Sequence, residues 1–187
     1  MEVLYHCSPT AGLKVLQPSV TKYFGKPRQV CLTASVSMAL FYGVKHFEYT
    51  YGYTREGKIY YEEYFPGALE AIYRGRSASL YRCARRPDME TTRIPNEYVT
   101  ARPVPVLEEI AIPDVCQALL EQERLGALRI VRWAELPERS RAWVLQAEKD
   151  TILEHGLLTQ DTGFARYMRE TYPDSWALAL AEQEAGA

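Results

Sequence analysis

The feature that most constrains the fold is a change of periodicity along the chain. Up to about residue 132, short runs of β-branched and aromatic residues alternate with Gly, Pro, Asn and Asp turn formers, which indicates strands. From about residue 134 onward, apolar residues recur mostly at helical spacing. Many short strands with the helices segregated behind them are typical of the α+β class. We therefore predict an α+β fold with a helical C-terminal portion.

Chain length sets the expected number of domains. The chain has 187 residues, of which 47% are hydrophobic, and a domain usually has about 100 to 200 residues. We expect one domain at residues 1–133 and a helical extension at residues 134–187 that packs on the same domain. Apolar stripes in the extension, which include Trp143 and Phe164, favour core packing over a partner surface.

The N-terminal segment contains two predicted strands. Residues 2–6 form a short apolar run that ends on His6, so we expect the first strand to stop there. Residues 9–16 are interpreted as a turn followed by a short helix. Residues 30–35, with the sequence VCLTAS, are β-branched and apolar, which predicts a second strand.

The segment after this strand carries a helical pattern. Its sequence, SVSMALFYGVKHF, covers residues 35–47. Its apolar stripe comprises Val36, Leu40, Val44 and Phe47. Residues at these spacings lie on one face of a helix, and Ser35 or Ser37 can cap its start. Tyr42 falls nearly opposite the stripe.

The middle of the chain is predicted to alternate strands with one short helix. Residues 49–65 indicate two tyrosine-rich strands around an REGK turn, and residues 65–75 indicate a short helix. Residues 77–84 are predicted to form a strand. Residues 85–95 mix charge with two prolines and are interpreted as a surface loop. Residues 96–112 resume an extended pattern, whose prolines favour edges or bulges.

Charge and hydropathy exclude some classes of partner. A formal net charge of −2 gives no global attraction to nucleic acid or to an anionic membrane. No apolar run approaches the roughly 20 residues that span a bilayer, and no basic segment followed by a long apolar one opens the chain. We therefore expect a cytoplasmic protein with no membrane partner.

Cysteine spacing argues against metal or disulfide chemistry. The four cysteines lie far apart without CxxC spacing and are Cys7, Cys31, Cys83 and Cys116. This spacing predicts neither a zinc site nor a disulfide framework, so we expect no metal. A thiol hydrolase built on Cys7 and His6 is disfavoured, because adjacent strand residues point to opposite faces.

Glu97 is the carboxylate that most suggests a site. It opens the strand EYVTA, where alternation puts Glu97, Val99 and Ala101 on one face. A carboxylate that shares a face with apolar residues is either solvated at a strand end or held in a cleft. The fourteen tyrosines of the chain suit a cleft that stacks a planar ligand, or else a tyrosine-rich strand surface.

Three segments in this order resemble a known family. They are LYHCSP at residues 4–9, VCLTASVSMALFYG at residues 30–43 and PNEYV at residues 95–99. Together they resemble the His-Tyr-Glu subgroup of NAD-dependent ADP-ribosyltransferases, which includes diphtheria toxin and the poly(ADP-ribose) polymerases. The resemblance covers residues 2 to about 132. It implies an ADP-ribosyltransferase-like fold, with split antiparallel β-sheets around an NAD cleft.

The resemblance assigns roles to single residues. It implies that His6 bonds the adenosine-side ribose of NAD, that the Cys7 backbone holds the nicotinamide carboxamide, and that Ser8 adds a polar contact. It implies that Tyr42 stacks on the nicotinamide ring and that Glu97 bonds the 2'-hydroxyl of the nicotinamide ribose. A fixed carboxylate there stabilises the oxocarbenium-like transition state as the glycosidic bond breaks.

The implied activity is therefore ADP-ribose transfer from NAD to an unknown macromolecular or small-molecule acceptor. The implied catalytic residues are Glu97, Tyr42 and His6. The implied cofactor-binding residues are His6, Cys7, Ser8, Thr33, Ser35, Phe41 and Tyr42.

Two departures from the family pattern leave a second interpretation open. Cys7 stands where the family usually has Gly, and Cys31 stands where the family has a second nicotinamide-stacking aromatic. Phe41, next to Tyr42, is an alternative stacking ring. The alternative function is a catalytically impaired module that binds a nucleotide or a protein.

The acceptor is constrained only weakly. Pro95 stands two residues before Glu97, where arginine-modifying members of the wider superfamily have Glu or Gln, so arginine modification is disfavoured. Arg85, Arg86 and Arg93 in the preceding loop could contact a phosphate-bearing acceptor, although such a charge run is usually solvated. A relationship to RNA 2'-phosphotransferases, which share the fold, would require a set of basic residues that the sequence does not display.

Overall fold

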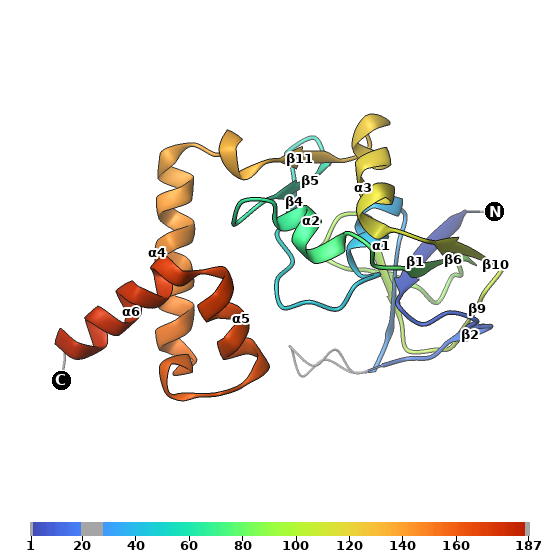
Figure 1. Cartoon of the computed structure of the whole chain (residues 1–187). Coiled ribbons are helices and arrows are strands. Elements are labelled where there is room, and N and C mark those ends of the chain that lie inside the picture. Colours follow the sequence, from blue (N-terminus) through green and yellow to red (C-terminus); the bar gives the residue numbers. More distant parts are fainter. Residues whose placement is uncertain (1, 20–27, 186–187) are drawn as a thin grey trace. The chain divides into compact units, whose positions relative to one another are not determined.

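The computed structural model describes residues 2–19 and 28–185, and it has the predicted α+β class. Its largest sheet has six strands in the order β10-β6-β1-β3-β8-β7. Figure 1 labels three of these neighbours, β10, β6 and β1. The six strands are β1 (Val3–Ser8), β3 (Val30–Thr33), β6 (Ala78–Ala84), β7 (Glu90–Thr91), β8 (Glu97–Thr100) and β10 (Glu108–Ile112). Their neighbours pair antiparallel throughout.

The first strand is longer than predicted. β1 runs from Val3 to Ser8, so the prediction that it stops at His6 is wrong. The reason is its partner, since all six β1 residues pair with β6, from Val3 opposite Ala84 to Ser8 opposite Ser79. A polar residue inside a strand costs little where a neighbouring strand satisfies its backbone.

The helix predicted within residues 9–16 is also wrong. Residues 15 and 16 form β2 (Val15–Leu16), which pairs antiparallel with β9 (Val104–Pro105). Leu16 and Val104 are both buried in one apolar cluster. Long-range burial therefore overrides the local helical pattern of this segment.

The predicted helix after β3 is present but short. It is α1 (Val36–Phe41), and Ser35 caps it by accepting a hydrogen bond from the Met38 N–H at 3.2 Å. At the end of α1 the hydrogen bonds reach back three residues instead of four. The Tyr42 N–H donates to the Ala39 carbonyl, and the Gly43 N–H donates to the Leu40 carbonyl. The prediction that the helix reaches residue 47 is therefore wrong, because a glycine interrupts it.

The middle of the chain follows the sequence pattern closely. β4 (Tyr51–Tyr53) and β5 (Ile59–Glu62) form the predicted tyrosine-rich hairpin, and with β11 (Arg129–Val131) they make a three-stranded sheet. The predicted short helix is α2 (Ala68–Tyr73), and α3 (Val115–Arg124) begins at its cap Asp114.

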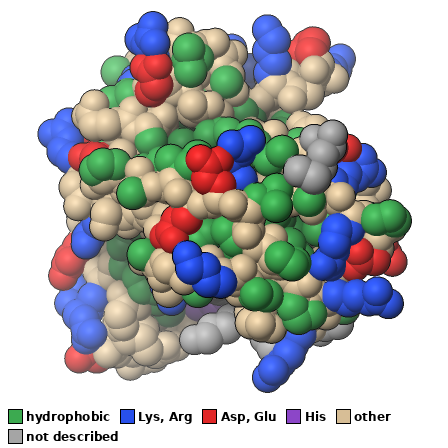
Figure 2. Space-filling view, turned by 90° about the vertical axis from the view of Figure 1, so that its right-hand side faces the viewer, with side chains coloured by type: hydrophobic (Ala, Val, Ile, Leu, Met, Phe, Trp, Pro, Cys, Tyr) green, Lys and Arg blue, Asp and Glu red, His purple; other side chains and the backbone are tan. Residues whose placement is uncertain are grey.

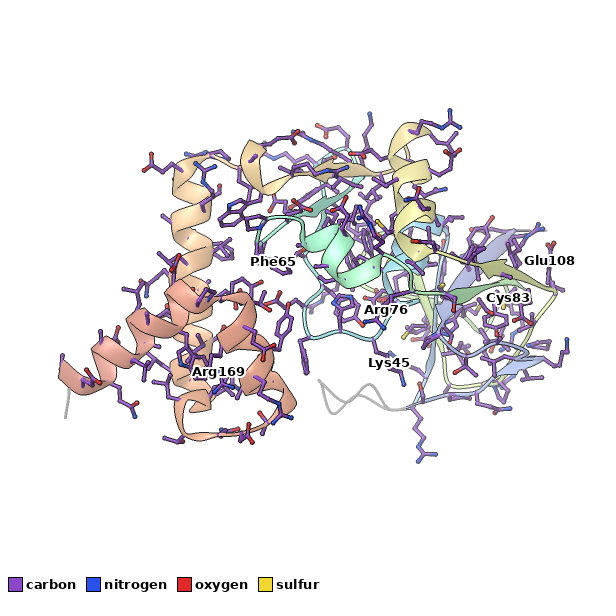
Figure 3. The ribbon with its side chains drawn as sticks, viewed as in Figure 1. Lys45, Phe65, Arg76, Cys83, Glu108 and Arg169 are labelled. Atoms are coloured by element: carbon purple, nitrogen blue, oxygen red, sulfur yellow. The ribbon has the colours of Figure 1, made fainter. Side chains whose placement is uncertain are left out.

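The chain divides into two compact units. The first comprises residues 1–61 and 69–130, and contains the six-stranded sheet. One sheet face packs against α1 and α3 through a cluster that includes Cys7, Met38 and Leu119. The other face carries a second cluster that includes Leu4, Leu32 and Cys83, of which Cys83 is labelled in Figure 3.

The second unit comprises residues 62–68 and 131–187. Its helices are η1 (Trp133–Glu135), α4 (Glu138–Glu154), η2 (Leu157–Thr159), α5 (Gly163–Thr171) and α6 (Pro173–Ala185). They bury a cluster of their own, which includes Ile152, Met168 and Ala179. The predicted helical C-terminal portion is thus confirmed, whereas its packing on residues 1–133 stays a prediction. Within the described ranges, no helix is long and apolar enough to cross a membrane.

Candidate functional site

Three neighbouring strands bring Glu97 beside the start of α1. Thr33 of β3 lies opposite Tyr5 of β1 on one side and opposite Glu97 of β8 on the other. Directly paired residues share a sheet face. Glu97 and Tyr5 therefore lie on one face, which is also the face of Cys7 and of the cluster under α1.

The loop before β8 fixes the direction in which Glu97 leaves the sheet. Asn96 has φ of 62°, in the left-handed region where Asn is enriched. Its carbonyl accepts a hydrogen bond from the Ala34 N–H at 2.9 Å, which ties the loop to the β3–α1 junction. The Glu97 N–H bonds the Ile94 carbonyl at 3.2 Å, and this bond closes the turn.

One oxygen of the Glu97 carboxylate is held by a neighbouring hydroxyl. Thr92 Oγ1 donates to Glu97 Oε2 at 2.5 Å, and Glu97 is only partly buried. The Thr92 hydroxyl therefore orients the Glu97 carboxylate. The sequence-based prediction that Glu97 opens a strand is confirmed.

Three tyrosine hydroxyls lie within electrostatic range of Glu97. Burial raises the pKa of Tyr42, of Tyr51 and of Tyr53, the last to about 12, and the negative charge of Glu97 contributes to all three shifts. The Tyr42 and Tyr51 hydroxyls share a hydrogen bond of 2.6 Å. The charge of Glu97 therefore acts on Tyr42, and also on Tyr51 and Tyr53, while a joint role of Tyr42 and Glu97 in one site stays a prediction.

Tyr42 combines an exposed position with aromatic support. Tyr42 is the C-cap residue of α1, and it is 40% exposed. One ring face stacks on Tyr49, with centroids 5.0 Å apart and planes 23° apart. The Tyr49 ring in turn packs against the His46 ring, with ring centroids 4.1 Å apart. A ring fixed in this way can present its remaining surface to a planar ligand.

The His6 side chain lies on the opposite face of the sheet from Tyr5, Cys7 and Glu97. Alternation along the strand directs it away from Tyr5 and toward Tyr81, with ring centroids 6.5 Å apart. Its Nδ1 lies 3.0 Å from the Cys31 carbonyl oxygen. Because a carbonyl only accepts, Nδ1 carries the proton and Nε2 is the acceptor nitrogen. Burial lowers the pKa of His6, so the ring is neutral at pH 7.

Cys7 points into the core rather than toward a ligand. The side chain is 3% exposed, and a Cβ added at Gly43 would lie 2.8 Å from its Sγ. Burial raises the pKa of the Cys7 thiol to about 12, so the thiol is protonated at neutral pH. Gly43 therefore makes the room that the Cys7 side chain occupies. Ser8 Oγ accepts a hydrogen bond from the Thr10 N–H at 3.1 Å.

The other predicted cofactor-binding residues have local structural roles. Thr33 is buried and its hydroxyl accepts from the Ser35 N–H at 3.0 Å, while Ser35 caps α1. Phe41 is 1% exposed, and its ring stacks on those of Tyr51 and Tyr61, with ring centroids 5.4 Å apart in each pair. The Phe41 ring is therefore buried in the core, and its contact with nicotinamide stays a prediction.

Sequence reasoning missed Thr92, Tyr51 and Tyr53. The tyrosines belong to a hairpin whose composition indicated either a cleft or a strand surface, without singling out a residue. Thr92 falls in a segment interpreted as a surface loop, although part of it forms β7. The one signal that could have found Thr92 is Asn96, four residues further on, which can adopt the left-handed conformation and reverse the chain.

Two of the three arginines in that loop have acidic partners. Arg85 pairs with Glu2 at 2.6 Å, and its guanidinium lies over the Tyr98 ring. Arg86 makes two hydrogen bonds to Asp88, at 3.0 and 2.9 Å. On the face shown in Figure 2, basic and acidic side chains are interspersed. These arginines therefore stabilise the loop.

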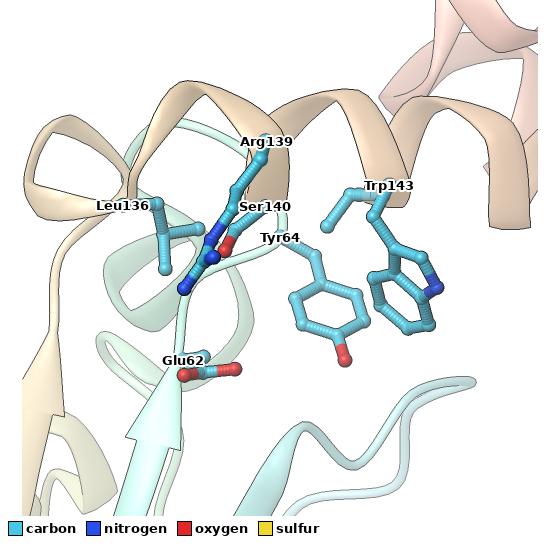
Figure 4. Close-up of a pocket in the computed structure, with 7 residues that line it drawn as sticks. Glu62, Tyr64, Leu136, Arg139, Ser140 and Trp143 are labelled. Carbon is cyan, nitrogen blue, oxygen red and sulfur yellow. The ribbon is translucent and has the colours of Figure 1, made fainter.

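A separate pocket lies within the second unit (Figure 4). It has a volume of about 280 Å³, and its polar groups come from Glu62, Arg139 and Ser140. Tyr64 and Trp143 form an edge-to-face pair beside them, with centroids 6.0 Å apart. None of the residues predicted from the sequence to bind NAD lines this pocket.

Metal chemistry has no evident site among the described residues, where no three His, Cys, Asp or Glu side chains gather as metal ligands. Comparison of the chain with protein-family models, curated proteins and solved structures gives no match.

Proposed function

We propose that this protein is an NAD-dependent ADP-ribosyltransferase that breaks the nicotinamide glycosidic bond and transfers ADP-ribose to an acceptor. The proposed arrangement is an ADP-ribosyltransferase-like pair of split antiparallel sheets around an NAD cleft. One observation carries the proposal. The Glu97 carboxylate accepts a hydrogen bond from Thr92, and its charge acts on the hydroxyl of Tyr42, a residue that is 40% exposed.

The proposed reaction places charge beside Glu97. The bond between ribose C1' and the nicotinamide nitrogen breaks, and neutral nicotinamide leaves with the electron pair. The positive charge that develops on the ribose is stabilised by a carboxylate that is already oriented. A lone pair of the acceptor then forms the new bond to C1', and the acceptor proton passes to water.

The remaining residues are proposed to bind NAD. Tyr42 stacks on the nicotinamide ring with the surface that Tyr49 leaves uncovered. His6 accepts a hydrogen bond from a ribose hydroxyl through Nε2, since Nδ1 is directed to the Cys31 carbonyl. The Cys7 side chain faces the core, which leaves its backbone as the group that contacts the carboxamide. Ser8 supplies a further polar contact.

The alternative function is a nucleotide-binding module without turnover. It is favoured by Cys31, which lies within electrostatic range of the Tyr42 hydroxyl and cannot stack on nicotinamide. The loss of a second stacking ring costs about 1 kcal/mol of binding. Such a protein would still bind NAD but would release no nicotinamide.

One experiment tests the activity and identifies the acceptor. The purified protein is titrated calorimetrically with NAD, then incubated with NAD and whole-cell lysate, and nicotinamide and ADP-ribosylated products are measured by mass spectrometry. Binding with nicotinamide release supports the transferase. Binding without release supports the alternative module, and the absence of binding contradicts both.

A further inference from the structure

We propose that Thr92 is the positioning residue of Glu97: its hydroxyl fixes one carboxylate oxygen so that the other faces the nicotinamide ribose. This inference rests on the proposed function. Thr92 Oγ1 lies 2.5 Å from Glu97 Oε2, which is a short hydrogen bond to a charged acceptor. Thr92 acts through Glu97 and touches no reacting atom.

The direction of this hydrogen bond is set by a second contact. The Ile94 N–H donates to Thr92 Oγ1 at 3.0 Å and occupies an acceptor site on the hydroxyl oxygen. A hydroxyl has one proton to donate, and the carboxylate oxygen can only accept it. Thr92 Oγ1 therefore accepts a hydrogen bond from the Ile94 N–H and donates its own proton to Glu97 Oε2.

The backbone holds the two residues at this separation. The Thr92 N–H bonds the Glu97 carbonyl at 3.2 Å, while the Glu97 N–H bonds the Ile94 carbonyl at 3.2 Å. Asn96 makes the return of the chain possible through its left-handed backbone. Side-chain and backbone bonds therefore restrain the same six-residue turn, and the carboxylate has little freedom to rotate.

Orientation of a carboxylate matters most as charge develops on the substrate. A hydrogen bond that keeps Glu97 Oε2 in place spares the reorganisation that a free carboxylate would need in the transition state. Ground-state binding of NAD depends on the other contacts of the site. Loss of the Thr92 hydroxyl should therefore lower kcat and leave NAD affinity nearly unchanged.

The test compares three variants in the full chain. Thr92→Val keeps the branched shape but removes the hydroxyl, Thr92→Ser keeps the hydroxyl, and Thr91→Val alters the exposed neighbour on β7. We expect Thr92→Val to lower kcat for nicotinamide release about tenfold with NAD Kd changed less than about twofold. Thr92→Ser should recover most of kcat, and Thr91→Val should match the wild type.

A double-mutant cycle with Glu97→Gln separates positioning of the carboxylate from support of the loop. If Thr92 acts through the charge of Glu97, Thr92→Val should cost much less in the Glu97→Gln background than in the wild type. An equal cost in both backgrounds, or wild-type kcat in Thr92→Val, overturns the inference while leaving the transferase intact. A wild-type protein that releases no nicotinamide overturns the proposed function and this inference with it.

Discussion

The two sides of the candidate site are held by different kinds of interaction. The Glu97 side comprises Thr92, Glu97, Tyr42, Tyr51 and Tyr53. Here side chains hydrogen-bond one another, and the charge of Glu97 contributes to the raised pKa of Tyr53. On the His6 side, formed by His6, Cys7 and Ser8, each side chain is engaged by backbone or by the core. The proposed chemistry therefore depends on side-chain interactions at Glu97, whereas the side chains of the His6 side are fixed by the backbone and the core.

A substitution at Gly43 is expected to disrupt the core packing around Cys7. A Cβ there would lie 2.8 Å from Cys7 Sγ and 2.9 Å from Ala78 Cβ. Overpacking of a filled core costs about 1 to 3 kcal/mol, so we expect Gly43→Ala to lower the free energy of unfolding by about 2 kcal/mol. Denaturant unfolding checks this value.

A second substitution tests whether Cys7 is the residue that Gly43 accommodates. Cys7→Ala removes Sγ, so Gly43→Ala should destabilise the Cys7→Ala protein less than it destabilises the wild type. Equal destabilisation in both backgrounds would show that Ala78 alone limits the space at residue 43.

Low pH should destabilise the folded protein through protonation of His46, which packs against Tyr49. His46 contacts Tyr49 and lies 2.9 Å from the Tyr73 hydroxyl, and burial lowers its pKa from 6.5 to about 4. Between these values the unfolded chain binds more protons than the folded one, so stability falls as the pH drops from 6.5 toward 4. After allowance for solvent screening, we expect a loss of about 1 to 2 kcal/mol.

Chemical denaturation at a series of pH values measures this loss. His46→Gln removes the titrating group but keeps a polar partner for Tyr73, so its stability should change less over the same interval. Because His6 also has a lowered pKa, some pH dependence remains in the variant. A His46→Gln profile with the same slope as the wild type would contradict the assignment to His46.

The smallest expected effects are on NAD affinity. Tyr42→Ala removes the proposed stacking ring and His6→Ala removes the proposed Nε2 acceptor, and a contact of either kind is worth about 1 kcal/mol. We expect either variant to weaken NAD binding about fivefold with a smaller effect on kcat, as measured by calorimetric titration and nicotinamide release. Unchanged affinity in both variants would remove these residues from the binding site.

Local signals explain what the sequence predicted correctly. The tyrosine-rich hairpin, the Ser35 cap and the Glu97 strand each depend on residues close together in the chain. The length of β1 and the pairing of β2 depend on distant partners in β6 and β9. Local propensity is overridden wherever long-range pairing buries more surface.

The candidate site was predictable to a similar extent. The sequence singles out Glu97 and Tyr42, and in the structure the charge of Glu97 contributes to the raised pKa of Tyr42. Thr92 is not singled out, because a hydroxyl in a charged, proline-containing loop has no periodicity to mark it. Phe41 was assigned a ligand contact because one helical position separates it from Tyr42, and only the packing shows that its ring is buried.

Nicotinamide release at saturating NAD by the wild type and by Glu97→Gln tests the central claim most directly. Gln keeps the size of the side chain but removes the charge, so turnover should fall by about 10² to 10³ while NAD Kd stays within about twofold. Glu90→Gln, which changes an exposed carboxylate on the neighbouring strand β7, should have wild-type turnover. A Glu97→Gln protein that releases nicotinamide at the wild-type rate would contradict the claim that Glu97 is catalytic.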